Sequence, residues 1–323
     1  MNHNKVYPGF WHAVLLCVIF VTVQMLVMTP FSVLDVVFKL KLSTHPALLG
    51  MINLMACGAV VYLGWLIGRP TLAEVFRCHR ISALAVVGVL IATCGAIIVL
   101  SEVDNLVRLV LPPPKWLEDL MRQLAFSPGR LWASVFLLVI VAPVTEEIMF
   151  RGLILRGFLT RFGVFKAFLL SSILFGAIHL NPWQFVSATT LGMMFAWWYA
   201  RTQSLIPCLI GHALTNGIVL GHQSLPFKVE GFNTGAAFES TGSQPVWFNL
   251  LGLGLLAVGL WLFRAATPSI PPRAESPVMP VPVSGEPDSG LPPIIATVSP
   301  AAAAAIPNLD SGVDARNDPD RES

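Results

Sequence analysis

Long apolar runs recur along the chain with short polar stretches between them, a pattern typical of a bundle of membrane-spanning helices. A helix needs about 20 apolar residues to cross a bilayer. The first run is too long for a signal peptide and no small-residue cleavage site follows it, so we expect it to be retained. The pattern predicts about eight spans, at residues 11–34, 47–68, 81–100, 131–158, 164–180, 182–200, 205–220 and 246–263.

Two segments depart from this pattern. The stretch LPPPKWLEDLMRQLAF alternates apolar and charged residues at helical spacing, which predicts a short helix lying in the membrane interface. Beyond about residue 267 the chain turns to Pro, Ala and Ser, and such a composition cannot bury a core. We therefore expect an all-α, polytopic bundle with N-terminal spans and the interfacial helix in 1–125, a catalytic bundle in 126–265 and a disordered Pro/Ala-rich tail in 266–323.

Composition agrees with a membrane protein. Hydrophobic residues make up 55% of the 323 residues and charged residues 12%, whereas about a quarter of an ordinary soluble domain is charged. The net charge of +2 and the absence of a basic stripe give no reason to expect a nucleic-acid partner. The five cysteines form no CxxC pair, so neither a disulfide framework nor a cysteine metal site is expected.

The distribution of Lys and Arg favours an orientation with both termini in the cytoplasm. With an even number of spans the termini share a side, and that side receives most of the basic residues outside the longest loop, where acidic residues accompany the basic ones. We expect a multi-pass protein of a bacterial cytoplasmic membrane. Trp197, Trp198 and Tyr199, just before Arg201, are typical of an aromatic belt at the interface.

The stretch TEEIMFRG follows the uncharged run LLVIVAPV and places ionisable groups at bilayer depth. Such groups are costly there and indicate function. Glu147 and Arg151 stand four residues apart in the favourable order for an ion pair, whereas Glu146 points about 100° away on a helix. In the alternative interpretation the span ends near Val144 and TEE begins a solvated loop. Against it, the apolar pattern continues through IMFRGLILRGFL.

Three further polar residues accompany the glutamates. If the fourth and fifth spans turn near 161–163, Glu146 and His179 lie at the same depth, each about 25 Å from the turn. His212 and Asn216 lie one turn apart in the seventh span. Taken singly, His179 could be a packing residue and the other two could hydrogen-bond between helices. Together with the glutamates they predict one polar site inside the bundle.

A carboxylate and an imidazole that converge on a water can take its proton, which makes a nucleophile for amide hydrolysis. A second histidine and an amide can then stabilise the oxyanion. Glu146, His179 and His212 could equally ligate a catalytic Zn²⁺ with an open position. The residues alone leave both alternatives open. The chain contains no HExxH, GxGD or GxSxG motif.

The motifs resemble those of the CPBP family, which groups type II CAAX prenyl endopeptidases with bacteriocin-processing and bacteriocin-immunity membrane proteins. APVTEEIMFRG is similar to the EExxxR signature, FGAIH to FxxxH and HALTN to HxxxN, in the family's order. The resemblance implies an intramembrane endopeptidase in which Glu146 and His179 activate water, His212 and Asn216 stabilise the oxyanion, and Glu147 and Arg151 form a supporting pair. It leaves metal dependence open.

Other functions compatible with the residues are a non-proteolytic scaffold or immunity factor of the same family and an ion or proton transporter. No internal repeat with paired, broken spans supports transport. The expected partners are the lipid bilayer and a membrane protein or lipidated peptide as substrate.

Overall fold

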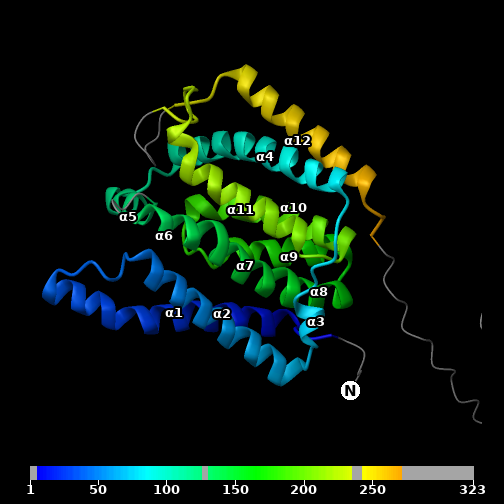
Figure 1. Cartoon of the computed structure of the whole chain (residues 1–323), viewed down its shortest axis with the longest axis horizontal. Helices are drawn as coiled ribbons and strands as arrows, with labels where there is room; N and C mark the ends of the chain where they lie inside the picture. The colour runs from blue at the N-terminus through cyan, green and yellow to red at the C-terminus, as the bar shows by residue number, and fades with distance from the viewer. Residues whose placement is uncertain (1–5, 126–129, 235–241, 271–323) are drawn as a thin grey trace, which may run out of the picture. The chain divides into compact units, whose positions relative to one another are not determined.

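Each of the eight apolar runs forms a helix in the computed structural model of the chain, which describes residues 6–125, 130–234 and 242–270 (Figure 1). No strand occurs in these ranges. The predicted tail lies outside them except for residues 266–270. The helices of the runs are α1 (Phe10–Phe38), α2 (Pro46–Gly68), α4 (Ala83–Val110), a continuous segment made of α6, η1, α7, η2 and α8 (Leu131–Arg161), α9 (Val164–Ala177), α10 (Pro182–Thr202), α11 (Ile206–Gly221) and α12 (Val246–Ala266).

Five of these helices are long and apolar enough to cross a membrane: α1, α2, α4, the segment Leu131–Arg161 and α12. With 14 and 16 residues, α9 and α11 are shorter than a bilayer core at 1.5 Å per residue. Two shorter helices, α3 (Leu72–Val75) and α5 (Lys115–Ala125), join the longer ones. The predicted amphipathic helix after the third span is therefore confirmed as α5.

The segment that carries TEEIMFRG is one unbroken helix with two π-helical stretches. It passes from α6 (Leu131–Val135) through the π-helix η1 (Phe136–Val141), α7 (Ala142–Glu147) and the π-helix η2 (Ile148–Leu155) to α8 (Arg156–Arg161). The alternative interpretation, in which the span ends near Val144, is wrong. Pro143 causes no break, because the wider turn of η1 lets the chain continue past a residue that has no N–H.

One end of the bundle, which we call the hairpin end, contains the turn between α8 and α9. Phe162 is extended and α9 begins at Val164, so the predicted turn at 161–163 is confirmed. Arg156 pairs with Glu74 of α3 at 2.5 Å. The loop after α3 is tied to the start of α11, since the Leu205 N–H donates to the carbonyl of Arg77 at 2.7 Å.

The opposite end, which we call the far end, contains the C-terminus of α4, the N-terminus of α10 and the loop after α11. Asn105 donates to the carbonyl of Gly231 at 2.7 Å, and the backbone N–H of Gln244 donates to Glu102 at 2.8 Å. The Trp183 indole donates to the carbonyl of Leu111. Since α9 starts at the hairpin end, His179 just after its C-terminus lies towards the far end.

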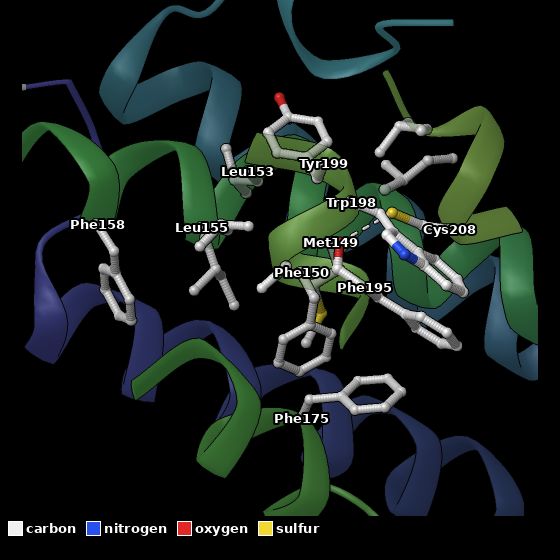
Figure 2. Close-up of a cluster of buried hydrophobic side chains, with 14 of the residues drawn as sticks. Met149, Phe150, Leu153, Leu155, Phe158, Phe175, Phe195, Trp198, Tyr199 and Cys208 are labelled. Carbon is white, nitrogen blue, oxygen red and sulfur yellow. Dashed lines mark hydrogen bonds between the residues drawn. The ribbon is translucent and has the colours of Figure 1, made fainter. Parts of the chain in front are cut away.

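The hydrophobic core extends from α1, α2, α4 and α12 to the Leu131–Arg161 segment, α9, α10 and α11. Figure 2 shows the part of it that the last four elements contribute. Trp198 and Tyr199 are fully buried in it. The expectation that they belong to an interfacial belt is wrong, because α10 is enclosed by neighbouring helices. Elsewhere in the bundle, α4 and α12 pack closely (Figure 1): a Cβ on Gly95 would lie 2.3 Å from the backbone nitrogen of Leu256.

Candidate active site

Glu147 is the centre of the polar site. Its side chain is fully buried, and its Oε1 atom accepts from Arg151 Nη1 at 2.9 Å and from His212 Nδ1 at 2.8 Å. The first contact comes from the next turn of the same helix, as i, i+4 spacing predicts. The second comes from α11 and joins the EExxxR motif to the HxxxN motif.

Arg151 is held by three further groups that the sequence did not indicate. Its Nη2 atom donates to the carbonyl of Gly192 on α10 at 3.1 Å. Its guanidinium carbon lies 4.7 Å from the ring centre of Phe175 and 5.3 Å from that of Phe195. Cation–π contacts of this kind are strongest where the cation is desolvated. The buried charge of Arg151 is thus compensated on several sides.

The contact with Glu147 sets the orientation of the His212 ring. A carboxylate oxygen accepts, so Nδ1 carries the hydrogen, an assignment made from the hydrogen-bond network. Nε2 then faces Glu146, with 3.8 Å between Nε2 and Oε2. That separation is too long for a hydrogen bond. Glu147 therefore directs the second ring nitrogen of His212 towards the other glutamate.

Glu146 differs from Glu147 in lining the cavity described below and in accepting no hydrogen bond from Arg151 or His212. The Oε2 atom of each glutamate is buried without a donor, but Arg151 and His212 compensate Glu147 through its Oε1 atom. A carboxylate on a cavity wall that no cation or donor compensates is a feature of reactive sites. The division predicted from the sequence, in which Glu147 is paired in cis and Glu146 is not, agrees with these contacts.

His179 lies in the turn that follows the C-terminal end of α9. Its Nδ1 atom contacts the carbonyl of Phe175 at 2.9 Å, and a carbonyl can only accept. Nε2 is therefore the nitrogen left for other partners. The Phe175 ring meets His179 and His212 edge-on, with centroid separations of 5.4 and 5.8 Å. No direct contact joins His179 to Glu146 among the described residues; the imidazole nearest to Glu146 is that of His212.

Asn216 is already engaged on the helix that carries the glutamates. Its Nδ2 atom donates to the backbone carbonyl of Leu138 in η1 at 2.7 Å. The sequence predicted no such partner. His212 and Asn216, one turn apart on α11, thus both contact the Leu131–Arg161 segment.

One large cavity is common to the polar residues. It has a volume of about 1420 Å³, and its wall includes Glu146, His179, His212 and Asn216. It continues along the second half of α1 and reaches the far end at Asp104, Arg108, Trp183 and His222. Sites for small molecules usually measure about 300–1000 Å³. This cavity has room for a longer chain.

The arrangement of Glu146, His179 and His212 bears on the alternative in which they ligate a Zn²⁺ ion. Within the described ranges, no three His, Cys, Asp or Glu side chains are arranged to hold a metal ion. The predicted ligands Glu146, His179 and His212 line one cavity but do not converge on one point. Zinc stays a prediction, which a measurement of metal content in the purified protein would test.

Phe175, Phe195, Gly192 and Leu138 are the site residues that sequence reasoning missed. Phe175 is the first residue of FxxxH, so the motif itself contained a signal for it. Phe195 and Gly192 belong to α10, which matches none of the three motifs, and Leu138 contributes only a backbone atom. Nothing in their residue types distinguishes them from ordinary core positions.

One part of the chain is similar to a known protein family. Residues 128–218 match the family model of Rce1-like type II CAAX prenyl endopeptidases. We call this matching segment the Rce1-like domain. It contains all six predicted site residues and lies within the bundle predicted at 126–265, whose exact limits remain a prediction. With its apolar helices, the chain is an integral membrane protein.

The chain also resembles part of YdiL of Bacillus subtilis (strain 168), whose name describes it as a candidate membrane peptidase. The two chains are 34% identical over 89 residues, which is 28% of this chain and 36% of YdiL. The match thus covers little more than a third of that relative. No solved structure matches the chain significantly.

Proposed function

We propose that the Rce1-like domain hydrolyses a peptide bond of a membrane-associated or lipidated protein, with Glu146 as the base that activates water. The observation that carries this proposal is the Glu146 carboxylate, whose side chain is 13% exposed on the wall of the cavity and whose Oε2 atom lies 3.8 Å from His212 Nε2. A base needs an accessible lone pair close to the reacting water. Glu147 cannot serve, because it is fully buried and compensated by Arg151 and His212.

The proposed reaction has two steps. Glu146 takes a proton from water as the water oxygen attacks the scissile carbonyl carbon, and His179 Nε2 accepts a second hydrogen bond from the same water. The Glu146 proton then moves to the leaving nitrogen as the C–N bond breaks, which regenerates the carboxylate. A protonated His212, held at Nδ1 by Glu147, donates from Nε2 to the oxyanion of the intermediate.

We also propose the side of the membrane from which the substrate enters. Described charged residues at the hairpin end are basic except Glu74, whereas those at the far end are mixed in sign. The excess of basic charge favours a cytoplasmic hairpin end, with both termini on that side. The cavity reaches the far end. A substrate would therefore present its cleavage site on the outer side of the membrane.

The test is cleavage of membrane-anchored reporter peptides by the full chain in proteoliposomes. Glu146→Gln keeps the size of the side chain and removes the base, so we expect turnover to fall by about 100-fold or more. Asp119→Asn is the matched control, because this exposed carboxylate on α5 lies outside the cavity wall. Wild-type turnover that Glu146→Gln leaves intact would contradict the proposal.

The other functions predict different results in the same vesicles. A scaffold or immunity factor would retain its cellular effect in Glu146→Gln. A transporter would show proton flux that depends on Glu146 without any cleavage product. A membrane proteome that compares wild type with Glu146→Gln would identify the substrate by the products missing from the variant.

A further inference from the structure

A backbone carbonyl on the helix that carries Glu146 has no backbone donor. In an α-helix the N–H of Ala142 would donate to Leu138, four residues earlier. In η1 it donates instead to Leu137, five residues earlier. The next residue that could donate to Leu138 across a π turn is Pro143, which has no N–H. The carbonyl of Leu138 is therefore left to a partner outside its own helix.

Asn216 is that partner. Its Nδ2 atom lies 2.7 Å from the Leu138 oxygen, a short hydrogen bond for an amide donor. On the same face of α11, His212 contacts Glu147 at 2.8 Å. The side chains of α11 thus contact the Leu131–Arg161 segment at Leu138, before Glu146 in the sequence, and at Glu147, directly after it.

We propose that Asn216 is a positioning residue: its hydrogen bond to Leu138 keeps the π turn of η1 in place and so fixes the direction in which Glu146 points. This inference rests on the proposed function. It differs from the role of oxyanion donor that the sequence resemblance implies for Asn216, since it assigns the side chain to the enzyme's own backbone.

The π turn depends on Asn216 because the Leu138 carbonyl can accept a hydrogen bond from only a few donors. Without Asn216, the nearest backbone donor for this carbonyl is the N–H of Ala142, and accepting from it restores the α-helical register at that point. The hydrogen bond then spans four residues instead of five. This change rotates the residues after it, relative to those before it, by the angle of one helical residue, about 100°. Glu146 lies in the part that turns. A carboxylate turned away from the cavity can no longer act as base.

A mutant cycle between Asn216 and Pro143 tests this assignment. Pro143→Ala restores a backbone N–H at the position from which a π turn can donate to Leu138. We expect Asn216→Ala to lower kcat by at least about 10-fold with KM little changed, the size of a coupling within one hydrogen-bond network. In the Pro143→Ala background, the same substitution should lower kcat by less than about 2-fold.

An oxyanion donor would give the opposite result. If Asn216 acts on the substrate, Asn216→Ala remains as damaging in the Pro143→Ala background as in wild type, and that outcome overturns the inference. Should Asn216→Ala fold poorly, Asn216→Asp replaces it, because the side chain keeps its size and loses the donor.

Thermal unfolding in detergent separates this inference from the proposed function. If wild type cleaves no reporter, the proposed function fails, but the midpoints still test the contact. Asn216→Ala should lower the midpoint more in the wild-type background than in the Pro143→Ala background. Equal losses in both backgrounds would show that Leu138 does not depend on Asn216.

Discussion

The carboxylate of Glu147 on α7 and the ring of His212 on α11 are joined through Oε1 and Nδ1, 2.8 Å apart. This contact joins two residues that are 65 positions apart in the chain. It leaves the second nitrogen of His212 facing Glu146. The orientation of the imidazole is thus set by a residue that does not face the substrate.

Glu147→Gln should therefore impair catalysis through His212. The amide carries no charge to hold the Nδ1–H, and we expect kcat to fall by about 100-fold. Because Arg151 is then buried without its counter-charge, the variant should also lose about 3–5 kcal/mol of stability. Turnover and thermal unfolding of the same samples check both effects, with Asp119→Asn as control. Full kcat in a folded Glu147→Gln protein would exclude the orienting role.

Gly152 follows Arg151 and allows α3 to approach the helix. A Cβ at this position would lie 2.3 Å from the carbonyl oxygen of Val75, a backbone atom that cannot move freely. We expect Gly152→Ala to lower the midpoint of thermal unfolding by several degrees. Gly254→Ala is the control, since no atom lies within 4 Å of its added Cβ, and alanine stabilises a helix interior by about 0.5–1 kcal/mol. Equal midpoints for the two variants would refute the prediction.

The pH dependence of stability has a contribution from Glu74, outside the spans. The backbone N–H of Thr71 donates to the Glu74 carboxylate, and this bond, together with Arg156, holds the pKa of Glu74 below its usual value. The stabilisation is present above the pKa of the unfolded chain and is lost as pH falls through the folded pKa. Since the carboxylate is about a third exposed, with 36% of its side-chain area accessible, we expect less than about 1 kcal/mol.

Thermal midpoints of wild type and Glu74→Gln between pH 7 and pH 3 measure this contribution. The two proteins should differ most at pH 7 and converge at the acidic end. A difference that stays constant over the whole range would mean that ionisation of Glu74 contributes nothing.

The proposed orientation predicts which thiols a membrane-impermeant maleimide can reach in intact cells. Cys78, exposed at the hairpin end, should react only after the cells are permeabilised. A cysteine introduced by Lys228→Cys at the far end should react directly. The reverse pattern would contradict both the orientation and the proposed side of substrate entry.

The sequence predicted the helices well, because lipid requires long apolar runs and such runs are visible without a structure. The ion pair between Glu147 and Arg151 could be predicted equally well, because i, i+4 neighbours on one helix are in contact in any tertiary arrangement. The turn at 161–163 follows from Gly163 between two apolar runs. These predictions depend only on local geometry.

The remaining features depend on rotation about the helix axes. Spacing from the turn predicted a depth for Glu146 and His179 but not the direction of any side chain, so the contact between His212 and Glu147 was not predicted. The π turns in η1 and η2 change the rotation further. The helix that contains Trp198 ends with aromatic and basic residues, and a helix that ends at the membrane interface has the same pattern. The sequence therefore could not show that Trp198 is buried.

The pairing of Glu147 with Arg151 within one helix also bears on biogenesis. A charged residue at the centre of a helix leaving the translocon costs about 2.5–3.5 kcal/mol on insertion scales. Because Arg151 lies one turn from Glu147, the two charges can neutralise each other before any later helix has been synthesised. His212 arrives with α11, 65 positions further along the chain, so the segment can enter the lipid first and acquire its imidazole partner only as the bundle assembles.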